Sequence, residues 1–457
     1  MQRVAKTEIG KHRNPKIVLC LLPSAFCLLM ALALPHITSA AVPSIITFRH
    51  DHHLFTIATK DYPQWQSKKE QLMYQGMPWD APASFRVDGD VLPALPAGVT
   101  KSSSPAWNHS AIRTDLEAIL KPLERDPGSV IIARSSTGVI FHGVGLPGRH
   151  VDLDLTVALA IQALEQGISD IRLPVTEIQP SIIVNDPALA QQGIKEVVTV
   201  GESDFSNSPA NRRHNIATGL NKFDGHLIPQ GSIFSFGETL GPVNARTGYL
   251  KELVIKGART EPDYGGGLCQ VSSTAYRGVW EYGLPITQRK NHSFAVNHYA
   301  PQGTDATVYP PTVDMKFKND GPSALLMQTY SEGDLAYFIY YGTKDMRDTE
   351  VIGPFIWNRS SPPGDRYERT TEIPPGTTKK VGSRVPGMSA MWVRITKMPD
   401  GKEKVEPVYS VYEARPLYIL VGVDPSELPP GGFGGSTEEV PADLLGEAVE
   451  DLSAAGD

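Results

Sequence analysis

The chain has 457 residues, 40% of them hydrophobic and 20% charged, which is typical of a soluble globular protein of about two to four domains. Its net charge of −7 is unevenly distributed: residues 1–40 carry five basic groups and one acidic group, and residues 424–457 carry nine acidic groups and no Lys or Arg. The part between them is nearly neutral, which argues against a nucleic-acid-binding protein.

The first 41 residues predict a targeting segment. Basic residues from Arg3 to Lys16 precede an apolar run of 18 residues, Ile17 to Leu34, and small residues follow at 38–41. This pattern is typical of a secretory signal peptide, although the run is also long enough for an uncleaved membrane anchor. Pro23 and the small residues favour cleavage. We expect an extracytoplasmic protein that is secreted, cell-wall-associated or membrane-anchored.

Cysteine usage then singles out one residue. Cys20 and Cys27 lie inside the targeting segment, so Cys269 is the single thiol of the remaining chain. An intramolecular disulfide is therefore excluded in the exported part, and a lone free thiol outside the cell requires an explanation.

Residues 44–125 predict a mixed α/β region that contains a loop or linker at Leu92–Pro105 and a short amphipathic helix at Ser110–Leu123. The motif "RHDHH" at 49–53 lacks further spaced ligands, so we expect a solvated loop and no metal site. No cofactor motif is found either.

Residues 126–199 predict a small α+β domain. Two β-rich runs flank a turn at Ser135–Gly138, which indicates a hairpin. Asp152 and Asp186 are expected to cap the two helices that follow them, and Gly167 is expected to end the first.

Residues 204–345 predict an α+β domain with a helix at Asn211–Phe223 and another that begins at Cys269, directly after a glycine loop. The strands expected in its second half are Pro285–Arg289, Phe294–Tyr299, Thr307–Tyr309, Val313–Phe317, Ala324–Tyr330 and Leu335–Tyr341.

Residues 350–423 predict a small β-rich module with a hairpin turn at Pro399–Gly401, and residues 424–457 a disordered acidic tail. The fold class expected for the whole chain is α+β multidomain, with a C-terminal all-β module.

A helical wheel over Cys269–Tyr282 indicates a mostly buried helix. One stripe is polar and is expected to face solvent: Gln270, Thr274, Arg277 and Glu281. Cys269 lies in the first turn, where unpaired N–H groups and the helix dipole stabilise a thiolate.

Cys269 is thus a candidate nucleophile, His292 a candidate base and Asp305 the residue that orients the base, with N–H groups near Gly267–Gln270 as oxyanion donors. His298 is the competing base. The alternatives are a small buried hydrophobic Cys, a hydrogen-bonded structural His and a turn Asp.

Residues 204–342 resemble the VanW family of exported bacterial proteins, first noted in some vancomycin-resistance gene clusters. The stretch "GGGLCQVSST" at 265–274 carries most of the resemblance, with "GLPITQRKNHSFAVNHY" and "GTDATVYPPTVDMKFKND". Gln230 departs from the family pattern at a turn. The resemblance implies Gly265, Gly266, Gly267, Gln270, Ser272, Ser273, Arg289 and Ser293 as substrate-binding residues beside the three catalytic candidates.

The stretch "GRHVDLDLTVALAIQALEQGISDIRLPVTEIQP" resembles a peptidoglycan-binding domain that often precedes VanW, and residues 350–422 more weakly resemble a small wall-associated β module. These resemblances imply a protein that acts on or recognises peptidoglycan stem peptides. Two functions remain open: acyl transfer by Cys, His and Asp (amide hydrolysis or transpeptidation), and binding or scaffolding without catalysis.

Overall fold

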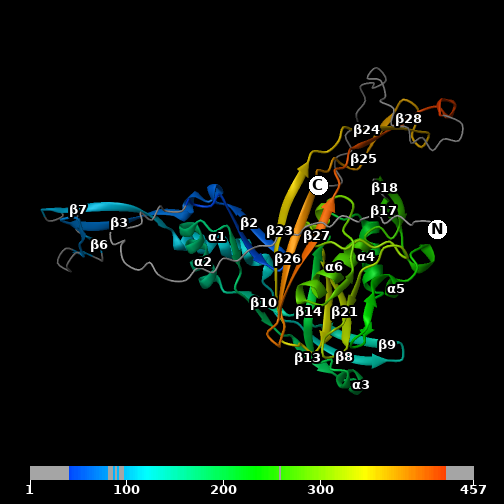
Figure 1. Ribbon diagram of the computed structural model, residues 1–457, viewed down its shortest axis with the longest axis horizontal. Helices are drawn as coiled ribbons and strands as arrows, with labels where there is room; N and C mark the ends of the chain where they lie inside the picture. Colours follow the sequence, from blue (N-terminus) through cyan, green and yellow to red (C-terminus); the bar gives the residue numbers. More distant parts are fainter. Residues whose placement is uncertain (1–40, 81–85, 88–89, 92–96, 257–258, 429–457) are drawn as a thin grey trace, which may run out of the picture. The chain divides into compact units, whose positions relative to one another are not determined.

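The computed structural model describes residues 41–80, 86–87, 90–91, 97–256 and 259–428. The targeting segment up to residue 40 and the acidic tail beyond residue 428 lie outside these ranges. The described chain combines several small sheets with a few helices, so the α+β multidomain prediction is confirmed (Figure 1).

The N-terminal strands pair as a hairpin, β1 (Ile45–His50) with β2 (His53–Ala58), and β11 (Asp170–Arg172) adds in parallel to β1. Helices α1 (His109–Leu120) and α2 (Leu153–Gln166) share one hydrophobic cluster with these strands. This cluster therefore combines side chains from the predicted 44–125 and 126–199 regions. The six-part domain division itself stays a prediction.

The loop predicted at Leu92–Pro105 is wrong in its second half, because β7 (Val99–Trp107) pairs there with β3 (Gln66–Tyr74). Most β7 side chains are exposed, so the strand has no hydrophobic alternation to reveal it. Residues 92–96 lie outside the described residues. The remaining short strands of this region are β4 (Met77–Pro78), β5 (Arg86–Val87) and β6 (Asp90–Val91).

The predicted hairpin and helix caps of 126–199 are confirmed. Strands β8 (Ser129–Ser135) and β9 (Gly138–Val144) flank the turn. Asp152 accepts a hydrogen bond from Leu155 N–H at the start of α2, and Gly167 ends that helix with φ 71°. Asp186 caps α3 (Pro187–Gln191) in the same way. The other strands are β10 (Gly148–Val151), β12 (Val175–Ile178) and β13 (Ser181–Val184).

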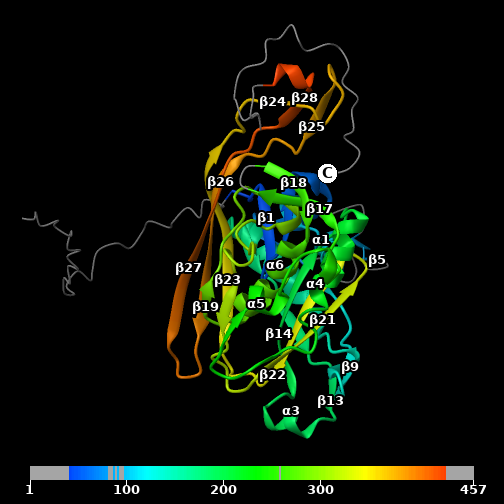
Figure 2. The same cartoon turned by 90° about the vertical axis from the view of Figure 1, so that its right-hand side faces the viewer.

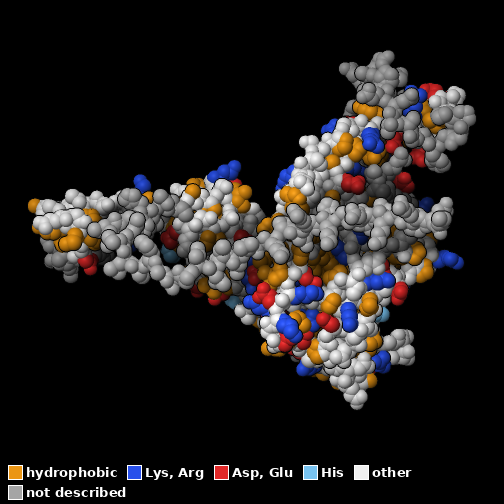
Figure 3. Space-filling model, in the orientation of Figure 1, with side chains coloured by type: hydrophobic (Ala, Val, Ile, Leu, Met, Phe, Trp, Pro, Cys, Tyr) orange, Lys and Arg blue, Asp and Glu red, His pale blue; other side chains and the backbone are white. Residues whose placement is uncertain are grey.

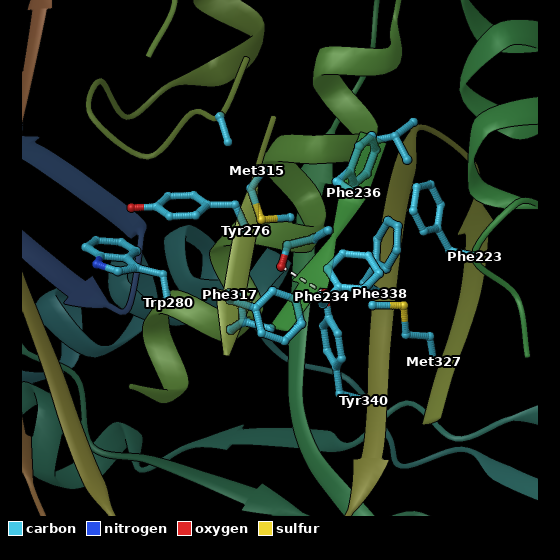
Figure 4. Close-up of a cluster of buried hydrophobic side chains, with 14 of the residues drawn as sticks. Phe223, Phe234, Phe236, Tyr276, Trp280, Met315, Phe317, Met327, Phe338 and Tyr340 are labelled. Carbon is cyan, nitrogen blue, oxygen red and sulfur yellow. Dashed lines mark hydrogen bonds between the residues drawn. The ribbon is translucent and has the colours of Figure 1, made fainter. Parts of the chain in front are cut away.

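The central sheet is antiparallel, in the order β14 (Glu196–Asp204), β22 (Leu335–Gly342), β21 (Leu325–Glu332) and β15 (Leu227–Ile228). Helix α6 (Leu268–Tyr282) packs on β14 and β22, and α4 (Ala210–Leu220) packs on α6 (Figure 1). Aromatic side chains fill the space between helices and sheet, among them Phe223, Phe338 and Trp280 (Figure 4). This core fixes the position of α6.

The solvent face predicted for α6 is wrong, because all four of its polar residues are buried. Other polar side chains satisfy them: Gln270 and Thr274 bond Ser203, Arg277 bonds Thr304, and Glu281 bonds His52. A helical wheel shows which side of a helix is polar, but it does not show that polar partners from other segments cover that side.

The "RHDHH" motif is not a solvated loop. His52 is 5% exposed, and its Nδ1 lies 2.6 Å from Glu281 Oε1. Burial lowers the pKa of His52 well below its ordinary value and raises the pKa of Glu281 well above its own. The motif therefore anchors the N-terminal hairpin to the end of α6.

Two predicted strands are wrong. Phe294–Tyr299 instead forms irregular chain and a 3₁₀ turn at Asn297–Tyr299, and Thr307–Tyr309 makes a single bridge to Val313. Tyr299 O accepts from the Arg277 side chain rather than from a neighbouring strand. The remaining strands here are β16 (Ile233–Ser235), β19 (Ile286–Gln288) and β20 (Lys316–Lys318), and α5 (Phe236–Leu240) follows β16.

The C-terminal region contains two three-stranded sheets (Figure 2). One pairs β23 (Asp348–Ser360), β26 (Gly387–Lys397) and β27 (Glu403–Tyr412), and the predicted hairpin turn at Pro399–Gly401 is confirmed between the last two. The other contains β24 (Arg366–Thr370), β28 (Tyr418–Gly422) and β25 (Thr378–Val381).

Candidate active site

The glycine loop lets the first turn of α6 pack closely against its neighbours. Gly265 and Gly267 have φ of 84° and 114°, values that L side chains rarely adopt. A Cβ at Gly266 would lie 2.7 Å from Leu253 O, in β17 (Lys251–Lys256), which pairs with β18 (Arg259–Tyr264). A Cβ at Gly267 would press on α4. The three glycines therefore allow the helix start to approach both elements.

Cys269 lies in that first turn with a free, half-buried thiol. Its Sγ is 3.4 Å from Thr307 Oγ1, and it donates to Val308 O at 3.7 Å. The thiol therefore faces the segment that follows Asp305.

His292 and Asp305 form a buried pair next to this thiol. Nδ1 of His292 lies 2.5 Å from Asp305 Oδ2, and the backbone N–H of His292 donates to the same oxygen at 2.7 Å. The Tyr299 ring stacks on the imidazole with centroids 4.2 Å apart. The carboxylate and the ring together fix the orientation of the imidazole.

The electrostatics favour an ionised thiol. Burial opposes ionisation of Cys269, but the interaction with His292 and the contacts with Thr307 and Val308 outweigh burial and lower the thiol pKa from 9.0 to about 7. Burial also opposes protonation of His292, yet the bond to Asp305 and the neighbouring Cys269 raise its pKa well above 6.5. The Nε2 atom is buried and hydrogen-bonded to no described residue.

Asp305 is held by four donors, which stabilise its charged form and lower its pKa against the effect of burial. Two come from His292, one is Arg289 Nη2 at 3.2 Å, and one is the Tyr412 hydroxyl at 2.5 Å. Sequence reasoning missed Tyr412, because it lies on β27, 107 residues further along the chain. No local pattern around Tyr412 marks it as a partner of Asp305.

The competing base His298 has other neighbours. Burial lowers its pKa, and the charges of Arg212 and Asp204 also act on it. The thiol pKa responds to His292 instead. His292 is therefore the base that the geometry favours.

The eight predicted substrate-binding residues fall into two groups. A groove of about 1670 Å³ is lined by Gly265, Gly266, Gly267 and Ser293, together with Cys269 and His292. The other four take no part in this lining: Gln270 bonds Arg212 and Ser203, Ser273 accepts from Ala306 N–H, Arg289 bonds Asp305, and the buried Ser272 hydroxyl meets no polar partner in the described chain. Their assignment as substrate-binding residues stays a prediction.

The predicted oxyanion donors are partly occupied within the turn itself. Leu268 N–H donates to Gly265 O at 3.0 Å, and Gln270 N–H donates to Gly267 O at 2.9 Å. Of the predicted donors, the backbone N–H of Cys269 is a candidate that these two bonds do not use, and the oxyanion role stays a prediction.

Alkylation of Cys269 is expected to follow a thiolate titration with a midpoint near pH 7. The thiol is reactive above its pKa, so the rate of iodoacetamide labelling rises as the pH increases through 7. Peptide mass spectrometry across pH 5–10 gives the midpoint. A midpoint near the ordinary value of 9.0 would contradict the interaction with His292.

These features define an α+β protein with a Cys–His–Asp arrangement at the start of a buried helix, beside a groove. Residues 211–340 match the family described as VanW like protein, which confirms the predicted resemblance over that range. The peptidoglycan-binding domain expected before it stays a prediction.

Two curated bacterial proteins are similar to the chain. One is the uncharacterized protein YoaR of Bacillus subtilis, 32% identical over 180 residues, which are 39% of this chain and 57% of YoaR. The other is the vancomycin B-type resistance protein VanW of Enterococcus faecalis, 28% identical over 114 residues, 24% of this chain and 42% of that protein. The chain thus spans about half the length of these relatives.

Within the described ranges, no helix is both long and apolar enough to cross a membrane. Basic and acidic side chains are interspersed over the described part of the face drawn in Figure 3.

Proposed function

We propose that the chain is an extracytoplasmic protein of the bacterial cell envelope that performs acyl transfer on peptidoglycan stem peptides. The observation that carries this proposal is the meeting of Cys269, His292 and Asp305 beside a groove, with a thiol pKa of about 7. The N-terminal targeting pattern and the VanW-like region support the location.

The reaction begins when the Cys269 thiolate attacks an amide carbonyl carbon of the peptide and forms a C–S bond. The Cys269 N–H and the α6 dipole stabilise the oxyanion. Protonated His292 gives its proton to the leaving amine as the C–N bond breaks, and a thioester remains. Asp305 keeps Nδ1 protonated, so that Nε2 is the atom that exchanges protons.

The second half of the reaction decides the product. His292 takes a proton from the nucleophile that attacks the thioester, and the C–S bond breaks. Water as the nucleophile gives amide hydrolysis, whereas the amine of a second stem peptide gives transpeptidation. The groove of about 1670 Å³ is large enough for two peptide segments, since pockets for drug-sized ligands measure roughly 300–1,000 Å³.

Recognition without chemistry is the second candidate function. It is favoured by one observation: His292 Nε2 is buried without a hydrogen bond of ordinary geometry in the described chain, although its proximity lowers the pKa of the Cys269 thiol. In that case the groove binds peptidoglycan, and Cys269 serves as a packing residue against Thr307 and Val308.

The test incubates purified sacculi with wild type and with Cys269→Ser, and identifies the muropeptides by mass spectrometry. Wild type is expected to change the products, and the variant to lose that activity by at least about 10³-fold while still binding sacculi. Hydroxylamine cleaves a thioester and releases its acyl group as a hydroxamate, so a peptide hydroxamate released from wild type identifies the intermediate. Unchanged muropeptides with wild type, together with sacculus binding, would leave only the recognition function.

A further inference from the structure

The C-terminal hairpin reaches the loop that carries Asp305. The Tyr412 hydroxyl, at the end of β27, donates to Asp305 Oδ1 at 2.5 Å and accepts from Gly303 N–H at 2.8 Å. Tyr412 is 2% exposed, so both contacts are sheltered from water. One buried hydroxyl thus holds both the carboxylate and the backbone two residues before it.

Three further contacts hold the loop that carries Asp305 and the loop that carries His292. Trp392 Nε1–H donates to Gln302 O at 2.8 Å, and Glu413 N–H donates to Ser293 O at 2.7 Å. Ser410 Oγ accepts from Arg289 Nη1 at 2.8 Å. The His292 loop and the Asp305 loop are therefore both held by β26, by β27 and by the residue that follows β27, all of which lie outside the VanW-like residues 211–340.

The two carboxylate oxygens of Asp305 accept hydrogen bonds from different donors. Oδ2 accepts both N–H groups of His292, whereas Oδ1 accepts from Tyr412 and Arg289. A carboxylate held at only one oxygen turns about its Cβ–Cγ bond. The donors on Oδ1 prevent this rotation and keep Oδ2 directed at the imidazole.

We infer that Tyr412 is a positioning residue of the candidate active site, which acts through Asp305 to keep the His292 imidazole in place beside Cys269. This inference rests on the proposed function for its catalytic meaning, although its effect on the thiol does not require turnover. Burial and the adjacent Asp305 charge raise the pKa of Tyr412, so the hydroxyl remains a protonated donor across the titration of Cys269 near pH 7.

Tyr412→Phe tests the inference, because it removes one hydroxyl and keeps the ring that packs in the core. The expected result is a rise of about one unit in the pH midpoint of Cys269 alkylation, since an imidazolium that is less firmly held stabilises the thiolate less. A loss of turnover of about tenfold should accompany it, with little change in KM.

Tyr409→Phe is the matched control, because Tyr409 lies on the same strand with a side chain that is 59% exposed. It should leave the midpoint unchanged. Ser410→Ala is a milder second variant, which removes one of the acceptors that hold Arg289, the other donor to Asp305 Oδ1, and a smaller rise in the same direction is expected. It provides the readout if Tyr412→Phe does not fold.

The outcomes separate the two proposals. A folded Tyr412→Phe that retains the wild-type midpoint overturns the positioning role. If Tyr412→Phe is unfolded, a folded Ser410→Ala with the wild-type midpoint overturns the premise that the donors on Asp305 Oδ1 position the imidazole. A raised midpoint in a protein whose wild type never changes muropeptides keeps the positioning role and overturns acyl transfer. A raised midpoint in Tyr409→Phe as well would show a general loosening of β27, and would also overturn the specific role of Tyr412.

Discussion

Asp305→Asn is expected to raise the midpoint of Cys269 alkylation from about 7 toward 9.0 and to slow turnover by about 10²–10⁴-fold. The carboxylate oxygen Oδ2 accepts two N–H groups of His292, at 2.5 and 2.7 Å. An Asn that keeps its side-chain oxygen toward Tyr412 and Arg289 places its NH₂ group against the two N–H groups of His292, where the carboxylate oxygen accepted them. The imidazole then loses both its orientation and its counter-charge.

The same substitution is expected to destabilise the fold by about 1–3 kcal/mol for each buried donor left without an acceptor. Because the folded-state pKa of Asp305 lies below 3.8, its charge contributes stability above that pH, and this contribution is lost as the pH falls below it. The difference in unfolding free energy between wild type and Asp305→Asn should therefore be largest near pH 7 and should shrink below pH 3.8.

Urea unfolding at pH 7 and pH 3 and the alkylation profile measure both effects. Asp314→Asn is a suitable control, because this carboxylate is also held internally, by Ser235 Oγ at 2.6 Å and Gly237 N–H at 2.7 Å, and neither of these donors belongs to His292. Its alkylation midpoint should equal that of wild type. An Asp305→Asn protein with the wild-type midpoint would exclude the carboxylate from any role in activating the thiol.

Gly278→Ala is expected to destabilise the protein by roughly 3 kcal/mol or more. Helix α6 lies so close to β14 that a Cβ at position 278 would be 2.5 Å from Gly201 N and 2.9 Å from Gly201 Cα. Backbone atoms cannot move aside as a flexible side chain does. Ala is otherwise favoured over Gly inside a helix by up to about 1 kcal/mol, so a loss of stability reports the helix–strand contact alone.

Urea unfolding curves for Gly278→Ala and for a control, Gly364→Ala, provide the comparison. A Cβ at Gly364 meets nothing within 4 Å, so the urea midpoint of unfolding of Gly364→Ala should match that of wild type. If Gly278→Ala were as stable as wild type, α6 would not lie against β14 at this point, and the placement of Cys269 by that contact would be wrong.

The elements that local chemistry specifies could be predicted from the sequence. Asp152, Asp186 and Gly167 mark helix ends because their side chains or backbone angles satisfy exposed helix termini. The glycine loop likewise predicted where α6 begins. The candidates Cys269, His292 and Asp305 were found from residue type and order.

The features that depend on contacts between distant parts of the chain could not be predicted from the sequence. The polar stripe of α6 indicates a solvated face until Ser203 and His52 are known to cover Gln270 and Glu281. The segment after His292 has strand-like composition, yet its backbone carbonyl at Tyr299 bonds the Arg277 side chain. Tyr412 has no local signature at all.

The position of Tyr412, 107 residues after Asp305, has a consequence for how the site is assembled. Synthesis runs from the N-terminus, so Cys269, His292 and Asp305 exist before the last strand that holds them. The carboxylate receives its full set of donors only after a further 107 residues have been made. A chain that extends only a little past Asp305 therefore lacks the Tyr412 donor, and Cys269 is expected to reach its full reactivity only once β27 is in place.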